Sequence, residues 1–123
     1  MGNPVEEAGR PSTSMETAMP AAMVQYVFKP NPGCDMSALM DLIKESAGMW
    51  RKHGAEVSLW GVQVGEVGNM AFAARCESTA KLGAVLDALN NDPAFAAWRM
   101  KSIKANLSTW VRSNQAYEVP IPT

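Results

Sequence analysis

The fold is decided by the stretch MSALMDLIKESAGMWRKHGAEVSLWGVQV, residues 36–64. In its first half, apolar residues recur at the three-and-four spacing that places them on one helix face: Met36, Leu39, Met40, Ile43, Ala47 and Trp50. The basic residues 51–53 and then Gly54 end this helix, and the alternating residues 55–64 predict a strand that follows at once. A helix with one apolar face that leads directly into a strand is expected to pack on a sheet.

Length and composition limit the classes of protein to which the chain can belong. It has 123 residues, 47% of them hydrophobic, which suits one domain around one core. The net charge is −1 and there is no basic run, so we expect no nucleic-acid partner and no anionic membrane partner. No apolar run approaches the roughly 20 residues that span a bilayer, and no signal-peptide pattern begins the chain. Only Cys34 and Cys76 are present, as is typical of a reducing compartment, so a cytoplasmic location is expected.

The chain divides into an N-terminal arm and a folded domain. Residues 1–21 contain prolines and polar residues with no periodic apolar face, which predicts a flexible arm. Residues 22–123 are predicted to form the single domain.

Three further segments have the pattern of strands. Residues 23–28 form a short β-prone run, and residues 70–76 return from a glycine-containing hairpin connection at 65–69. The last strand, residues 108–119, alternates two sets: Trp110, Arg112 and Asn114 against Val111, Ser113, Gln115 and Tyr117.

The helices have recognisable first residues. Asp35 is a predicted N-cap of the first helix, and Ser78 of a second whose stripe contains Leu82, Val85, Leu86 and Leu89. Asp92 followed by Pro93 is typical of a new helix start, so the second helical region is expected to be broken in two. We expect Phe95 and Trp98 or Arg99 to point inward from its second half.

This order predicts an α+β fold of the ferredoxin-like βαββαβ type. Right-handed crossovers place both helical segments on one face of a four-stranded antiparallel sheet. The other face is then left without helices, and we expect it to carry Tyr26 and Phe28, or Ala71 and Ala73. Such a face is too apolar for water, so a second copy is expected to pack against it in a homodimer.

The same residues resemble a known family. The chain is similar to the dimeric α+β barrel superfamily, most of all to NIPSNAP-type proteins, over about residues 22–119. The motifs that carry the resemblance are Lys29-Pro30-x-Pro32-Gly33, Trp50-Arg51-Lys52-His53-Gly54, Gly65-Glu66 and Asp92-Pro93-x-Phe95-x-x-Trp98. The resemblance implies that two protomer sheets pair into a barrel. Relatives include cofactor-independent oxygenases and haem-degrading enzymes, but no catalytic residue is common to them.

Two residues are candidates for proton transfer. His53 is the only histidine and a natural general base, but it also stands at a helix end, where its side chain can serve the last carbonyls. Tyr26 is the alternative group that could move a proton. No cluster of His, Cys and carboxylate residues has metal-ligand spacing, so neither a metal nor a cofactor is expected.

Ligand-binding candidates come from aromatic and polar residues in apolar surroundings. Trp60, Trp98 and Trp110, together with Trp50, either fill the core or wall a pocket for an apolar ligand. Arg75 and Arg112 lie in predicted strands and need a carboxylate, solvent or a ligand oxyanion. The predicted ligand-binding residues are Gln25, Trp60, Arg75, Trp98, Trp110, Arg112 and Asn114.

Two functions are consistent with this sequence. The first is a NIPSNAP-like barrel that binds a small apolar ligand between helices and sheet, or that acts only as an interaction module. The second is a cofactor-independent monooxygenase or isomerase acting on an aromatic or polyketide-like molecule, with apolar walls that exclude water.

Overall fold

The computed structural model describes residues 20–123, so most of the predicted N-terminal arm lies outside the described residues. The elements follow the predicted order: β2 (Ala22–Pro30), α1 (Met36–Lys52), β3 (Glu56–Gly61), β4 (Met70–Cys76), α2 (Thr79–Asn90), α3 (Pro93–Ala105) and β5 (Ser108–Tyr117). The largest differences are at strand ends. β3 ends at Gly61 rather than at residue 64, and β5 ends at Tyr117 rather than at residue 119.

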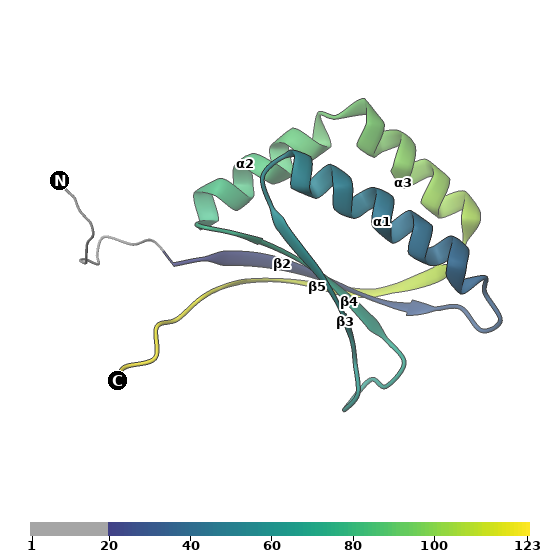
Figure 1. Ribbon diagram of the computed structural model, residues 1–123, viewed down its shortest axis with the longest axis horizontal. Helices are drawn as coiled ribbons and strands as arrows, with labels where there is room; N and C mark the ends of the chain where they lie inside the picture. Colours follow the sequence, from purple (N-terminus) through teal and green to yellow (C-terminus); the bar gives the residue numbers. More distant parts are fainter. Residues whose placement is uncertain (1–19) are drawn as a thin grey trace.

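The four strands form one sheet in the order β3-β4-β2-β5, and every neighbouring pair is antiparallel. Figure 1 shows all three helices on the same side of this sheet. The ferredoxin-like prediction is therefore confirmed. We call the side under the helices the covered face and the opposite side the free face.

The three helices begin where the polar caps predict. The side chains of Asp35, Ser78 and Asp92 accept hydrogen bonds from backbone N–H groups of the first turn, at 3.1, 3.0 and 2.9 Å. These bonds satisfy donors that have no partner inside a helix. Gly54, with a φ of 102°, supplies the left-handed residue after α1 that lets the chain turn into β3.

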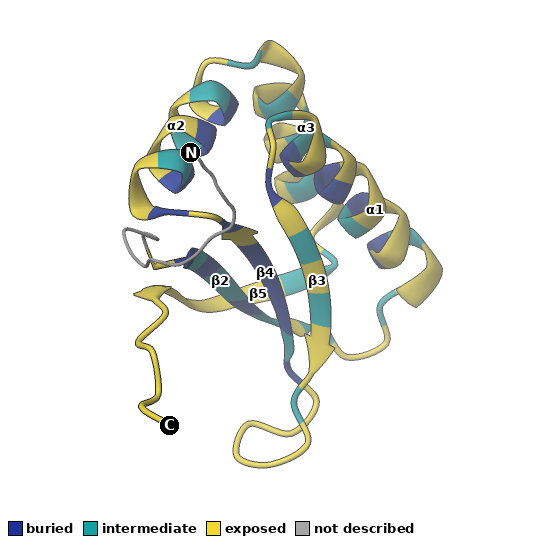
Figure 2. Ribbon diagram, turned by 60° about the vertical axis from the view of Figure 1, so that its left-hand side comes forward, coloured by how far each residue is buried: buried dark blue, intermediate teal, exposed yellow. Residues whose placement is uncertain are grey.

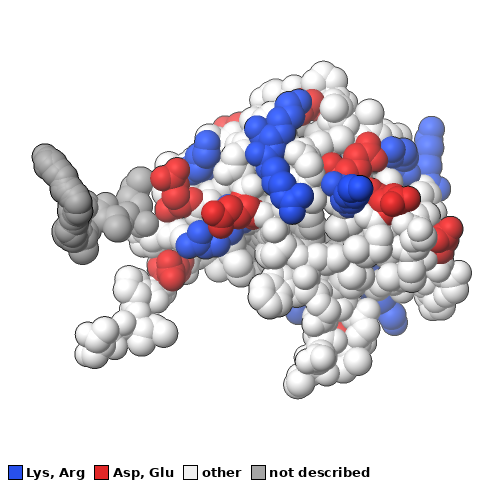
Figure 3. Space-filling view, viewed as in Figure 1, with Lys and Arg blue, Asp and Glu red and all other residues white. Residues whose placement is uncertain are grey.

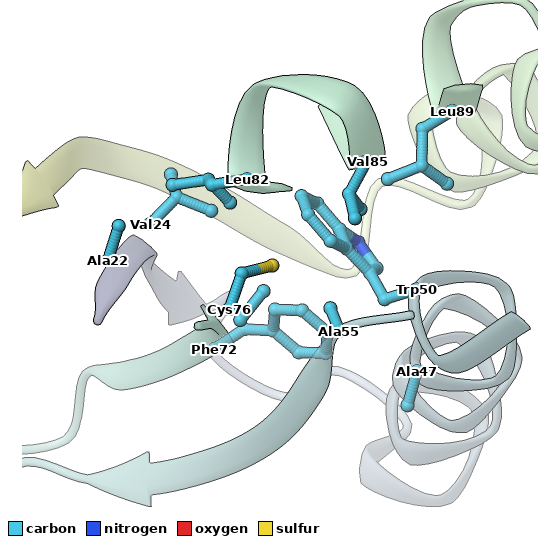
Figure 4. Packing of buried hydrophobic residues seen from close by; sticks show 11 residues of the cluster. Ala22, Val24, Ala47, Trp50, Ala55, Phe72, Cys76, Leu82, Val85 and Leu89 are labelled. Atoms are coloured by element: carbon cyan, nitrogen blue, oxygen red, sulfur yellow. The ribbon is translucent and has the colours of Figure 1, made fainter. Parts of the chain in front are cut away.

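The main core lies between α2, α1 and the covered face. In Figure 4, Leu82, Val85 and Leu89 of α2 point toward Trp50 and the sheet. Trp50 is 3% exposed, and its ring centre lies 6.0 Å from that of Tyr26, 6.2 Å from Phe72 and 6.5 Å from Phe95. Aromatic pairs at such distances add to the stabilisation from burial. Trp50 therefore joins α1, α3 and the two central strands.

The prediction that Tyr26 and Phe28 lie on the free face is wrong. Both pack against the core on the covered face, and it is Val27 between them that points to the free face. The reason is the strand alternation: Val24 is buried in the core, so residues 26 and 28 share its side. The placement of Ala71 and Ala73 on the free face is confirmed, because they alternate with core residues Phe72 and Ala74.

A β-bulge overturns one further prediction. Val27 is opposite Arg112, but Phe28 is opposite Trp110, so β5 contains an extra residue at this point. A bulge shifts the alternation of the strand by one residue. Trp110 therefore lies on the covered face beside Phe28, whereas Arg112 and Asn114 lie on the free face, and the three do not share a side as the simple alternation predicted.

The free face consists of rows of residues that are neighbours across the strands. One row contains Trp60, Ala71, Val27 and Arg112, and the next contains Ser58, Ala73, Gln25 and Asn114. The central members are nearly buried by their neighbours, whereas Trp60 on the edge strand β3 is 61% exposed. Figure 2 shows the same contrast between buried central strands and the exposed strand β5.

Charged side chains of both signs are interspersed over the helical layer in the view of Figure 3. No helix within residues 20–123 is both long and apolar enough to cross a membrane.

Candidate functional site

A cavity of about 710 Å³ lies between the helical layer and the covered face. It is lined by Tyr26, Phe28, Leu39, Leu42, Ile43, Ser46, Trp50, Phe72, Leu86, Leu89, Asn90, Phe95, Trp98, Arg99, Ser102, Ile103, Asn106, Ser108 and Trp110. The aromatic and aliphatic members dominate this lining. Its size and composition are those of a small-molecule pocket.

Aromatic rings form one continuous wall of this cavity. Phe95 and Trp98 stack with ring centres 5.6 Å apart and an interplanar angle of 16°, and Phe95 meets Trp50 edge to face. The indole N–H of Trp98 donates to the carbonyl of Leu42 at 2.9 Å. This bond orients the Trp98 ring and ties α3 to α1.

Polar residues are a minority of the cavity lining, and two of them bear most directly on its chemistry. Arg99 is the only charged residue among the described residues that line it, and its guanidinium carbon lies 5.3 Å from the centre of the Phe95 ring. The Tyr26 hydroxyl is the second. Burial raises its pKa above the ordinary value, and the positive charge of Arg99 partly offsets that rise. Tyr26 is therefore neutral at physiological pH and able to donate a hydrogen bond.

His53 does not line the cavity. Its Nε2 lies 2.9 Å from an Asp92 carboxylate oxygen, which also lies 3.5 Å from the Lys52 ammonium group. The backbone N–H of His53, not its side chain, contacts the carbonyls of Met49 and Trp50 at the end of α1. His53 thus connects the end of α1 to the start of α3.

Asp92 holds a charge at this junction. Hydrogen bonds from His53 and from the Ala94 N–H lower the pKa of its carboxyl group below the ordinary value. The same carboxylate caps α3.

The predicted ligand-binding residues fall into two groups. Trp98 and Trp110 line the cavity, as does Tyr26. The remaining five lie on the free face, where each bonds to a neighbour. Arg75 pairs with Glu56 at 3.4 Å, Arg112 with Glu66 at 2.6 Å, Asn114 donates to Gln25 at 3.3 Å, and the Trp60 indole donates to Ser58 at 2.9 Å.

Arg99 was predicted only as an alternative to Trp98 for pointing inward from the last helix, and not as a member of the site. The available signal was its spacing from Phe95, since residues four apart on a helix share a face. Ser46, Ser102 and Asn106 were also missed, because small polar residues between apolar ones give no periodic pattern. Only the packing of α1 and α3 over the sheet brings them together.

Neither cysteine lies in the cavity lining. Cys76 is buried in the core, and burial raises the pKa of its thiol, which disfavours the reactive thiolate. Within residues 20–123, no group of three His, Cys, Asp or Glu side chains is placed to hold a metal ion.

Comparison with known proteins gives structural matches alone. No protein-family model matches the sequence, and no curated protein matches it either. A NIPSNAP-like domain protein from Burkholderia xenovorans superimposes with a TM-score of 0.61 at 12% identity, covering 82% of this chain and 85% of its own. A NIPSNAP family protein of unknown function from Agrobacterium tumefaciens gives 0.63 at 11% identity, covering 85% and 91%.

A further match is SnoaB, a cofactor-independent oxygenase from Streptomyces nogalater. It superimposes with a TM-score of 0.56 at 12% identity, and the alignment covers 85% of this chain and 96% of SnoaB. The chain therefore has the α+β fold of NIPSNAP-like proteins and of SnoaB, as the sequence resemblance implied. At such identities the likeness concerns the fold alone.

Proposed function

We propose that this protein binds a small, largely apolar aromatic ligand in the cavity between its helices and its sheet. The observation that carries the proposal is the cavity itself, about 710 Å³ with a wall of aromatic rings and a mostly apolar lining. Ligand pockets measure roughly 300–1,000 Å³ and have this kind of lining.

The cavity is a pocket that opens to solvent on one side, where the lining residues Ile103 and Trp110 are each 65% exposed. Concave and mostly apolar pockets of this kind are where small molecules bind. Every ring that faces empty space loses contacts that a ligand could restore. Residues of all three helices and of β2, β4 and β5 contribute to the lining, so the whole domain participates in the site.

A thermal-shift series tests this proposal. Polycyclic aromatic probes should raise the melting temperature in a saturable way, because a ligand that binds only the folded state stabilises it. A Ser102→Trp variant should lose this shift, since a large ring at Ser102 would occupy the cavity. Ala97→Trp is the matched control, because Ala97 is exposed on the same helix and does not line the cavity. Equal shifts in both variants would overturn the proposal.

We also infer that the free face packs against a second copy in a homodimer. The support is the exposed Trp60 beside Val27 and Ala71, in a row that small side chains keep flat. A contact between two identical faces would bury the exposed Trp60 in both copies at once. Sedimentation at micromolar concentration should give a dimer, and a stable monomer would contradict the inference.

A second candidate function is cofactor-independent oxygenation of the bound aromatic molecule. Two observations favour it: the fold likeness to SnoaB, and the Tyr26 hydroxyl, a neutral proton donor inside an apolar cavity. In this role Tyr26 rather than His53 would contact the substrate. Oxygen consumption with an aromatic substrate, measured in the presence of a chelator and lost in Tyr26→Phe, tests it, and unchanged consumption in that variant would contradict it.

A further inference from the structure

Arg99 stands out because it is the one charged residue in the described lining of the cavity, and its charge has no partner among the described residues. Two cations of the helical layer are paired: Lys101 lies 2.7 Å from Glu45, and Lys52 lies 3.5 Å from Asp92. No ion pair within residues 20–123 involves Arg99, and the cavity lining that includes it contains no carboxylate. A guanidinium over an aromatic ring can still donate in its own plane, where it matches the two oxygens of a carboxylate.

Two hydrogen-bond donors in the same cavity also lack a partner among residues 20–123. The indole N–H of Trp50 donates to no described group although the residue is 3% exposed, and the Tyr26 hydroxyl makes no hydrogen bond to them. Buried donors without an acceptor are costly, so such groups are normally satisfied. A ligand that carries acceptor oxygens would satisfy them. The cavity therefore combines flat apolar walls, unsatisfied donors and one unpaired cation.

We propose that the ligand is a planar aromatic carboxylate whose rings lie against the Phe95, Trp98 and Trp110 side chains and whose carboxylate is bound by Arg99. This inference rests on the proposed ligand-binding function and specifies the chemical class of the ligand. The aromatic surface supplies the larger contact area, and the charge pair selects the anion over a neutral molecule of the same shape.

A pair of probes of nearly equal shape tests the charge preference. Anthracene-9-carboxylate and its neutral carboxamide are titrated separately into the full chain, with calorimetry as the readout. The carboxylate should bind about tenfold more tightly or better, as expected for a charge-assisted contact with arginine. In Arg99→Gln this preference should vanish while the affinity for the carboxamide stays unchanged. Arg99→Lys should keep part of the preference.

Lys104→Gln is the matched control, because it removes one positive charge from α3 at an exposed position that does not line the cavity. Its preference for the carboxylate should equal that of the wild type. Equal binding of the two probes to the wild type, or a preference that survives Arg99→Gln, would overturn this inference and leave the proposed function standing. If neither probe binds the wild type, both this inference and the proposed function fail. Arg99 is exposed, so melting curves of its variants should match the wild type and exclude misfolding as the cause.

Discussion

The side chains on the two faces of the sheet find their contacts in different ways. On the covered face, apolar residues such as Phe72 and Ala74 meet side chains from helices that are distant in sequence. On the free face, polar residues bond to neighbours within the sheet or its hairpin, as Arg75 does with Glu56 and Arg112 with Glu66. The covered face thus depends on tertiary packing, whereas the free face is largely satisfied by pairs across strands. Successive residues of one strand therefore alternate between contacts with the helices and contacts within the sheet.

Lysine substitutions at two neighbouring alanines give the largest expected contrast. Ala74 on the covered face is fully buried, so Ala74→Lys would place an unpaired ammonium group in the core and should prevent folding. Ala73→Lys on the free face should fold, because its charge can reach water, but it should not dimerise. Circular dichroism and sedimentation measure the two effects.

A folded Ala74→Lys protein, or a fully dimeric Ala73→Lys protein, would contradict the difference between the two faces. The first result would mean that the core is not where the helices meet the sheet. The second would mean that the free face is not the contact between copies.

Tryptophan truncations give the next largest contrast. Trp50→Ala should lower the free energy of unfolding by about 3–5 kcal/mol, because it removes a buried ring that contacts three other aromatic residues. Trp60→Ala should cost under about 1 kcal/mol in a monomer, since the ring is largely exposed. Urea denaturation checks both, and equal losses would contradict the assignment of the two faces.

The sequence alone was sufficient to predict the elements, and the reasons are local. Asp35, Ser78 and Asp92 mark helix starts because each cap acts within its own first turn. The strand order followed from the handedness of the crossovers, which is also independent of side-chain detail. The position of α1 could be predicted because its apolar residues repeat over several turns.

Strand faces were harder to predict, and Trp110 shows why. A single extra residue in β5 moves Trp110 to the other side of the sheet, and nothing in the local sequence marks that bulge. Tyr26 and Phe28 were misplaced because both faces of β2 are rich in apolar residues. The cavity, and the place of Arg99 in its lining, depend on how far α1 and α3 lie from the sheet. That distance is a property of the packed molecule.

A pair of serine substitutions gives a smaller contrast. Ser78→Ala should lower the free energy of unfolding by about 1 kcal/mol, because its hydroxyl caps α2 beside the core. Ser58→Ala on the free face should change it by less than about 0.5 kcal/mol, since the exposed hydroxyl only accepts a bond from Trp60. Chemical denaturation of both variants checks this order, which a larger effect at Ser58 would reverse.

The junction of α1 and α3 above the covered face should respond to acid. The pKa of Asp92 is lower in the folded state than its ordinary value of 3.8, so its charge stabilises the fold fully above that pH. This contribution should disappear as the pH falls below 3.8 through the lower folded value. Asp92→Asn keeps a capping group but loses the charge that faces His53 and Lys52.

Melting temperatures of wild type and Asp92→Asn should therefore differ at neutral pH, with the wild type higher. The difference should shrink as the pH falls below 3.8. A difference that stays constant down to strong acid would show that the carboxylate charge contributes nothing.

The indole N–H signals of the four tryptophans offer the most direct test of the two-faced account. Trp50, Trp98 and Trp110 line the cavity, whereas Trp60 lies on the free face with an exposure close to that of Trp110, 61% against 65%. In a nitrogen-resolved NMR titration with anthracene-9-carboxylate, the first three signals should shift together and saturate while that of Trp60 stays in place. A saturable shift of Trp60 with the other three unchanged would contradict the account, because the ligand would then occupy the opposite side of the sheet.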